Sequence, residues 1–116
     1  MTANGFRRIA LGMKEATEGS HMGHPDFRAH GRIFATLKPG LEAGMVVLTP
    51  EQQEVFVRDH PAVFAPENGA WGRQGCTGVV LAAVDEETAG EALTLAWQNS
   101  AAKAKAKGKP KATRKA

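Results

Sequence analysis

The last 16 residues, AAKAKAKGKPKATRKA, cannot enter a hydrophobic core, so only about 100 residues of the chain remain to form one. This segment holds seven basic residues, no acidic residue and no apolar residue larger than alanine except Pro110. Like charges repel, and a segment of this composition buries too little apolar surface to offset the entropy lost on ordering. We therefore predict one domain over residues 1–100 and a disordered basic tail over residues 101–116. A domain of this size buries about 60–70% of its unfolded surface, which is enough for one core.

The net charge of the chain hides a division between domain and tail. The formal net charge is +3, from 15 basic and 12 acidic residues, but residues 1–100 hold 8 basic and 12 acidic residues and carry −4. Net charge therefore does not attract polyanions to the domain. The tail is suited to contact phosphate backbones without reading bases, and DNA is the expected partner. A solubilising tail that binds nothing specific is the alternative. The candidate tail residues are Lys103, Lys105, Lys107, Lys109, Lys111, Arg114 and Lys115.

Composition also restricts the environment of the chain. The sequence has no run of about 18 apolar residues, so we expect no membrane-spanning helix and no membrane partner. The first residues lack the apolar stretch and cleavage site of a signal peptide. The single cysteine, Cys76, excludes an internal disulfide framework. We expect a cytoplasmic protein.

Apolar periodicity predicts three helices. The first spans residues 4–16, with Asn4 as its N-cap. The second spans residues 49–60 and begins with a capping box from Thr49 to Gln52, with Val55 and Phe56 facing inward. The third follows Asp85 and ends near residue 100. Its apolar stripe comprises Ala89, Ala92, Leu93, Ala96 and Trp97.

Alternation of apolar and polar residues predicts the strands. Residues 26–37 form a β-hairpin whose turn is His30-Gly31. Further strands cover residues 45–48 and 76–84, and residues 62–75 are irregular. The fold class is α+β: a single two-layer domain with a mostly antiparallel β-sheet and α-helices packed on one face, in the order α-β-β-β-α-β-α. A further short strand near His21 or near Val63 also fits the pattern.

Histidines raise the question of a metal site. His21, His24, Asp26 and His30 offer nitrogen and oxygen ligands that zinc accepts. Their spacing matches no zinc signature, so we expect polar residues at a loop and strand edge, and no metal or other cofactor. Cys76 opens an apolar strand and fits a small core thiol better than a nucleophile. No acid–base pair accompanies it, so we expect no enzymatic activity.

The stretch EGSHMGHPDFRAHGRIFATL at residues 18–37 resembles the MmcQ/YjbR-like family. The family pattern G-x-P-x-F followed by G-[KR]-x-F-A corresponds here to Gly23, Pro25, Phe27, Gly31, Arg32, Phe34 and Ala35. RDHPAVF at residues 58–64, AWG at 70–72 through Gly75, the strand that follows and the last helix with Trp97 also resemble it. Cys76 departs from the pattern, which has a bulky aromatic residue there, and the basic tail lies outside it.

This resemblance implies an antiparallel sheet with flanking helices, similar to frataxin-like and secretion-chaperone-like α+β folds. Family members have been labelled DNA-binding from the double-wing appearance of their hairpins. The resemblance brings no catalytic residue and no cofactor.

Two binding functions fit the residues of the domain. In the first, a DNA-binding module uses cations beside an aromatic residue for phosphate contact and stacking. Its candidates are Arg28, Arg32, Lys38, Trp71 and Arg73. In the second, the Trp71 loop and the sheet face bearing Phe34 form a shallow groove for a protein or small ligand. A purely structural role is the third interpretation, with Trp71 closing the edge of the core and the arginines solvated.

Overall fold

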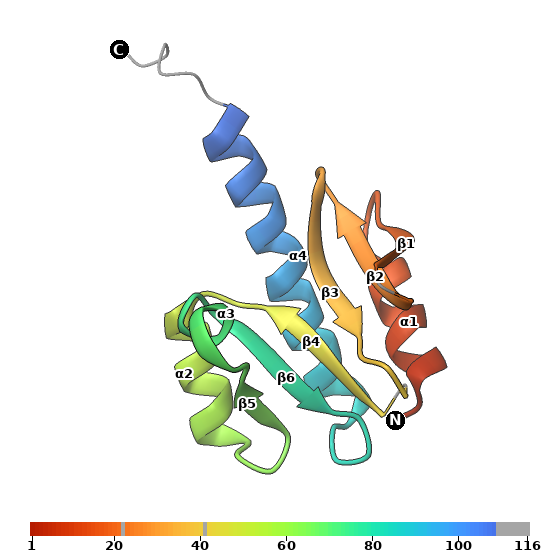
Figure 1. The fold of residues 1–116 in the computed structure, drawn as a ribbon, viewed down its shortest axis with the longest axis vertical. Helices are drawn as coiled ribbons and strands as arrows, with labels where there is room; N and C mark the ends of the chain where they lie inside the picture. Colours follow the sequence, from red (N-terminus) through yellow and green to blue (C-terminus); the bar gives the residue numbers. More distant parts are fainter. Residues whose placement is uncertain (22, 41, 109–116) are drawn as a thin grey trace.

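The computed structural model describes residues 1–21, 23–40 and 42–108. Within them a six-stranded antiparallel sheet has the order β1-β2-β3-β4-β6-β5, and α4 crosses behind it (Figure 1). The predicted α+β class is confirmed. The strands are β1 (Thr17–His21), β2 (His24–Ala29), β3 (Arg32–Leu37), β4 (Ala43–Val47), β5 (Phe64–Pro66) and β6 (Cys76–Val80). The helices are α1 (Ala3–Leu11), α2 (Pro50–Asp59), α3 (Gly69–Arg73) and α4 (Glu86–Gly108).

The strand register separates a helix-covered face of the sheet from an open one. Phe27, Ala35, Val46 and Thr77 pair across four strands and so share a face. Phe27 packs edge-on against Phe6 of α1, and the Thr77 hydroxyl lies 3.2 Å from the Gln53 amide nitrogen of α2. This face therefore carries the core. The neighbouring row defines the open face and comprises Gly19, Asp26, Thr36, Met45, Gly78 and Ala65.

The predicted β2–β3 hairpin forms, with a two-residue turn and a bulge. His30 and Gly31 have φ values of 60° and 75°, the left-handed pair that a tight hairpin turn requires. The register shifts after Phe27, so that Phe34 is an extra residue in β3. Phe34 and Ala35 are both fully buried as a result. The prediction that Phe34 lines an open groove is wrong, because the bulge interrupts the alternation of faces.

Local capping sets the beginning of α2 as expected. The Thr49 hydroxyl accepts a hydrogen bond from the Gln52 amide at 3.1 Å, and the Gln52 side-chain oxygen accepts one from the Thr49 amide at 3.0 Å. Phe56 is buried, but Val55 is 42% exposed, so its predicted inward position is wrong. Helical spacing turns Val55 about 100° away from its neighbour.

The first helix is shorter than predicted. It begins after Thr2, whose hydroxyl accepts a hydrogen bond from the Gly5 amide, and it ends at Leu11 with Gly12 as the C-cap. The predicted N-cap and the predicted end at residue 16 are both wrong. Glu15 has a φ of 63°, a left-handed conformation that does not continue a helix.

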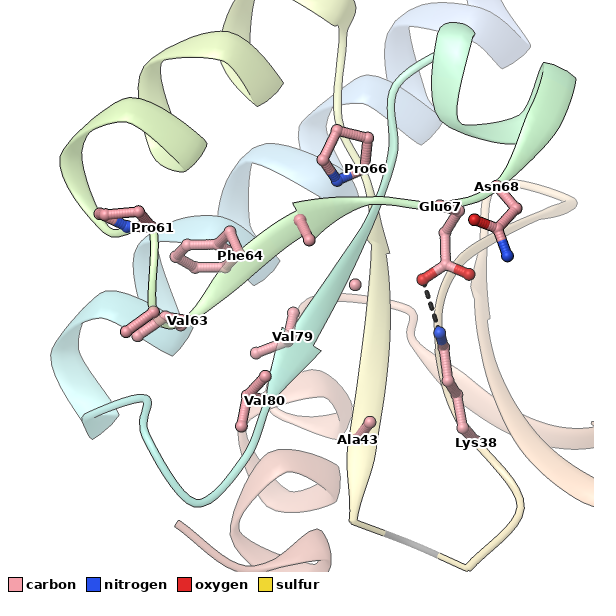
Figure 2. A pocket seen from close by; sticks show the side chains of 13 residues that line it. Lys38, Ala43, Pro61, Val63, Phe64, Pro66, Glu67, Asn68, Val79 and Val80 are labelled. Carbon is pink, nitrogen blue, oxygen red and sulfur yellow. Dashed lines mark ion pairs between the residues drawn. The ribbon is translucent and has the colours of Figure 1, made fainter.

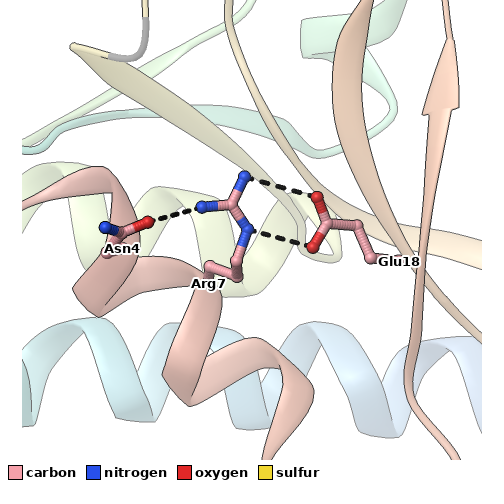
Figure 3. A network of polar contacts seen from close by, with 3 residues as sticks. All are labelled: Asn4, Arg7 and Glu18. Carbon is pink, nitrogen blue, oxygen red and sulfur yellow. Dashed lines mark hydrogen bonds and ion pairs between the residues drawn. The ribbon is translucent and has the colours of Figure 1, made fainter.

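An exposed polar cluster ties α1 to the edge strand β1 (Figure 3). The Arg7 guanidinium donates to both oxygens of Glu18, at 2.9 and 3.3 Å, and to the Asn4 side-chain oxygen at 2.6 Å. Because this contact joins residues on two elements, it fixes α1 beside the first strand.

The segment 62–75, predicted to be irregular, contains β5 and α3. The sequence suggested a short strand near His21 or near Val63, and both form, as β1 and β5. Strand β6 ends at Val80, four residues before its predicted end. The chain turns there: the Val84 amide donates to the Val80 carbonyl, and the N-terminal ammonium of Met1 donates to the Leu81 carbonyl. Leu81 and Val84 remain in the core.

Helix α4 extends beyond its predicted end. Asp85 accepts a hydrogen bond from the Thr88 amide at 2.7 Å, which is the expected N-cap contact. The helix then continues to Gly108, so residues 101–108 are helical where a disordered tail was expected, and the rest of that prediction, residues 109–116, lies outside the described residues. Alanine and lysine favour helix, and acidic residues at the start with basic residues at the end suit the helix dipole. No helix in the described part of the chain is both long and apolar enough to cross a bilayer.

Candidate nucleic-acid interface

Arg28, the first candidate, lies on the open face and neutralises a buried carboxylate. Its guanidinium donates to both oxygens of Asp26, at 2.8 and 3.1 Å. The Asp26 side chain is completely buried, whereas that of Arg28 is 47% exposed. The hydrogen bonds from Arg28, and then the charge of Asp26, raise the pKa of the guanidinium. Gly19 faces this pair, and a Cβ atom at Gly19 would lie 2.9 Å from an Asp26 oxygen. The absence of a side chain at Gly19 therefore leaves room for the Asp26–Arg28 ion pair.

Lys38 forms a second ion pair on the same face (Figure 2). Its ammonium lies 2.6 Å from a Glu67 oxygen, so the pair connects the end of β3 to the end of β5. Gly78 of β6 lies beneath it, and a Cβ atom at Gly78 would come within 2.7 Å of the Glu67 carboxylate. Both open-face ion pairs therefore occupy space that a glycine leaves free.

A shallow cavity adjoins the Lys38–Glu67 pair. Its volume is about 260 Å³, and its lining combines the β5 segment with part of β6. Val63, Val79 and Val80 give it apolar character, while Lys38 and Glu67 form its polar end (Figure 2). Val80 is 47% exposed. Phe34 is not among the lining residues, because it belongs to the core on the other face.

Trp71 is the most exposed large apolar side chain in the described part of the chain, at 69%. The interpretation that it closes the edge of the core is therefore wrong. Helix α3, which carries it, is held in place by Gln53 of α2. The Gln53 amide nitrogen donates to the Gly72 carbonyl at 3.0 Å and lies 3.1 Å from the Cys76 carbonyl. A Cβ atom at Gly72 would come within 1.8 Å of the Glu67 carbonyl oxygen, so α3 packs directly on the backbone before it.

The other two domain candidates lie apart from each other. Arg73 is exposed in the last turn of α3, and Arg32 is half-buried at the start of β3. In the described residues no ion pair involves either guanidinium. The structure therefore divides the five predicted domain residues. Trp71 and Arg73 are both exposed on α3, two residues apart, Arg28 and Lys38 form ion pairs with carboxylates, and Arg32 lies by itself at the start of β3.

The basic end of α4 provides the remaining candidates. Lys103 is exposed, and Lys105 and Lys107 follow in the same helix. Lys109, Lys111, Arg114 and Lys115 lie outside the described residues. Figure 1 shows that this end of α4 projects beyond the sheet, away from the acidic domain.

Cys76 and His30 lie in environments typical of residues with a structural role. Burial is the main factor that raises the pKa of the Cys76 thiol, followed by the charge of Glu67, while Lys103 lowers it. A thiol of raised pKa is a weak nucleophile at neutral pH. His30 Nδ1 lies 3.1 Å from the Ser100 hydroxyl, and its ring packs on Trp97 at 5.4 Å. The described residues contain no group of three or more His, Cys, Asp or Glu placed to hold a metal ion. The His21 side chain lies outside the described part.

The carboxylate partners of the two cations were not predicted from the sequence. Asp26 and Arg28 are two residues apart on one strand and so share a face, and this spacing could have predicted their ion pair. Glu67 gives no such signal, because only the pairing of β5 with β6 brings it near Lys38.

Comparison with known proteins assigns the fold to a family. The model of the YjbR family matches residues 11–99. The chain belongs to the YjbR family. Among solved structures, this YjbR protein is similar to the crystal structure of the Deinococcus radiodurans protein DR2400, which carries the domain DUF419. The two share 20% sequence identity with a TM-score of 0.69, over 92% of this chain and 80% of that one. This likeness concerns the fold alone. No curated protein matches the sequence.

Proposed function

We propose that this YjbR protein is a non-catalytic nucleic-acid-binding protein whose cationic C-terminal segment contacts DNA without sequence preference. The observation that carries the proposal is a run of seven basic residues without an acidic one, whose first three extend α4 beyond the sheet (Figure 1). Cations gathered in this way bind phosphates by releasing condensed counterions. The DNA-binding label implied by the family resemblance supports the same partner.

The open face of the sheet is the less suitable interface. Two of its cations, Arg28 and Lys38, are paired with carboxylates, so a phosphate would have to compete with Asp26 and Glu67. Residues 1–100 also carry a net charge of −4. The proposal therefore assigns most of the binding free energy to the helix end and the residues after it, and little to the hairpin.

Fluorescence anisotropy with a labelled DNA duplex, measured across a salt series, tests the proposal. The variant replaces all seven C-terminal cations by glutamine in the full-length chain. We expect the wild-type protein to bind with a log–log salt slope no steeper than about −6, at ~0.9 per phosphate contact, and the variant not to bind. Circular dichroism checks that α4 persists, since glutamine favours helix nearly as well as lysine. Unchanged binding by the variant would overturn the proposal.

The cavity beside β5 favours a second candidate function, the binding of a small apolar ligand. Its lining is mainly apolar with one polar end, which is the usual composition of a ligand site, and its volume is about 260 Å³. The test uses hexanol as a probe and the amide shifts of β6 in an NMR titration. We expect saturable, salt-insensitive shifts that Val80→Gln removes. The control Val55→Gln changes a similarly exposed valine on α2, outside the cavity. Shifts that survive Val80→Gln would refute this candidate.

A further inference from the structure

Helix α3 and the part of α4 just before its basic residues both contact the first turns of α2. The Asn99 side chain of α4 donates to the Val47 carbonyl at 3.1 Å and to the Gln52 side-chain oxygen at 2.8 Å. The next residue of α2, Gln53, holds α3 through the Gly72 carbonyl. Lys103, one helical turn beyond Asn99, is close enough to lower the pKa of Cys76, which lies just after α3. These contacts place Asn99, four residues before Lys103, beside the first turn of α2, and the next residue of that turn holds α3.

Trp71 is exposed on a backbone that is held rigidly. Its neighbour Gly72 packs against the Glu67 carbonyl, and a Cβ atom at Gly75, where φ is +113°, would lie 1.9 Å from the Leu48 carbonyl oxygen. The C-terminal part of α3 and the turn that follows it are therefore packed directly on neighbouring backbone. An indole that stays 69% exposed in such a position can accept a planar group without reorganisation of the protein.

The charges around Trp71 suit a polyanion. Arg73 is exposed two residues along the chain, and Lys103 is exposed on α4. The Glu67 carboxylate at this end is neutralised by Lys38 at 2.6 Å. Residues 1–100 carry a net charge of −4, so electrostatics alone does not select this spot. The exposed aromatic side chain of Trp71 is what distinguishes this spot.

We propose that Trp71 is a stacking platform for an unpaired base, with Arg73 and Lys103 on the adjoining phosphates, so that this protein prefers single-stranded nucleic acid to duplex. This inference rests on the proposed function and specifies its ligand. In a duplex both faces of each base are covered by neighbouring pairs, whereas an unpaired base offers a free face. Stacking of one base on an aromatic side chain strengthens binding about 10-fold or more.

The test compares three fluorescein-labelled ligands of equal length with the full-length protein. These are oligo(dT), a fully abasic strand with the same backbone, and a duplex. We expect oligo(dT) to bind about 10-fold more tightly than the abasic strand. Trp71→Ala should remove that difference while leaving binding to the abasic strand unchanged, and Trp71→Phe should keep most of it. Leu11→Ala, which truncates an exposed apolar residue on α1, is the matched control.

Tryptophan fluorescence supplies an independent readout. Oligo(dT) should quench the emission of the wild-type protein, and this quenching should be lost in Trp71→Ala, because Trp97 is partly buried and donates its indole N–H to the Lys14 carbonyl. Equal affinity for oligo(dT) and the abasic strand would overturn the inference, as would a preference that survives Trp71→Ala. If either outcome is found and the duplex still binds through the seven cations, the proposed function stands and only the inference fails. If no ligand binds, both fail.

Discussion

The cations on the open face of the sheet and those on the end of α4 carry the same charge but lie in different surroundings. Arg28 and Lys38 lie against carboxylates at 2.8 and 2.6 Å, in spaces left free by glycines. Lys103 is exposed on α4, and no ion pair involves it in the described residues. A count of basic residues treats these groups as equal. Their surroundings show that the first two stabilise the domain, whereas the third has its charge free to attract a polyanion.

The largest effect that separates the two groups is expected in DNA affinity. Replacing Lys103, Lys105 and Lys107 by glutamine should weaken duplex binding by up to about 100-fold near 0.1 M salt, if each lysine contacts one phosphate. Lys38→Gln removes one charge from the sheet and should change affinity by less than about 3-fold, because that lysine is already paired. Anisotropy titrations measure both. Equal losses per removed charge would abolish the distinction between the two groups.

A large effect on stability is expected at the carboxylate that Arg28 neutralises. Asp26→Asn should lower the free energy of unfolding by about 2–3 kcal/mol, because a completely buried carboxylate loses its charge-assisted hydrogen bonds. Urea denaturation measures the change. Glu18→Gln is the control, since the ion pair of Glu18 with Arg7 is solvent-accessible and should contribute less than about 1 kcal/mol. Similar losses in the two variants would show that burial does not set the role of Asp26.

A smaller effect tests whether pairing keeps Lys38 from DNA. Glu67→Gln should release its ammonium and steepen the salt slope of duplex binding by about 0.9. Glu54→Gln is the matched control, because it removes the same charge from an exposed position on α2. The difference between the two variants isolates Lys38 from the change in net charge. Identical slopes would mean that Lys38 does not reach phosphate even when unpaired.

The smallest expected effect concerns the start of α4, the helix that presents the basic residues. The hydrogen bonds from Thr88 are the main reason that the pKa of Asp85 lies below its usual 3.8. A carboxyl group with a lowered folded-state pKa stabilises the protein above its unfolded pKa, and this contribution is lost as the pH falls through the folded value. Asp85→Asn keeps a good N-cap but does not titrate. The melting temperature of the wild-type protein should therefore fall slightly more than that of Asp85→Asn between pH 5 and pH 3, as followed by circular dichroism. Parallel curves would contradict this assignment.

Elements specified by neighbouring residues were predictable from sequence. The capping box from Thr49 to Gln52 and the left-handed turn at His30-Gly31 depend on hydrogen bonds and backbone angles within a few residues. The family motifs are also local, and the family match over residues 11–99 confirms the resemblance. The DNA-contacting role of the basic residues stays a prediction, because it concerns a partner.

Elements specified by contacts between distant segments were not predictable in detail. The bulge that turns Phe34 into the core arises from the register of two strands. Helix α3 is a single turn with two glycines, whose intrinsic helix propensity is low, and it depends on Gln53 from another helix. Val80 lies in an apolar run, yet the turn after it leaves its side chain 47% exposed.

The sequence by itself determined the α+β class, the hairpin, the start of α2 and the division of charge between residues 1–100 and the basic segment. Each of these follows from short-range periodicity, backbone preference or simple addition of charges. Only the tertiary structure decided which cations are paired, which face holds Phe34 and that Trp71 is exposed. These depend on which segments meet, because ion pairing and burial are set by neighbours in space.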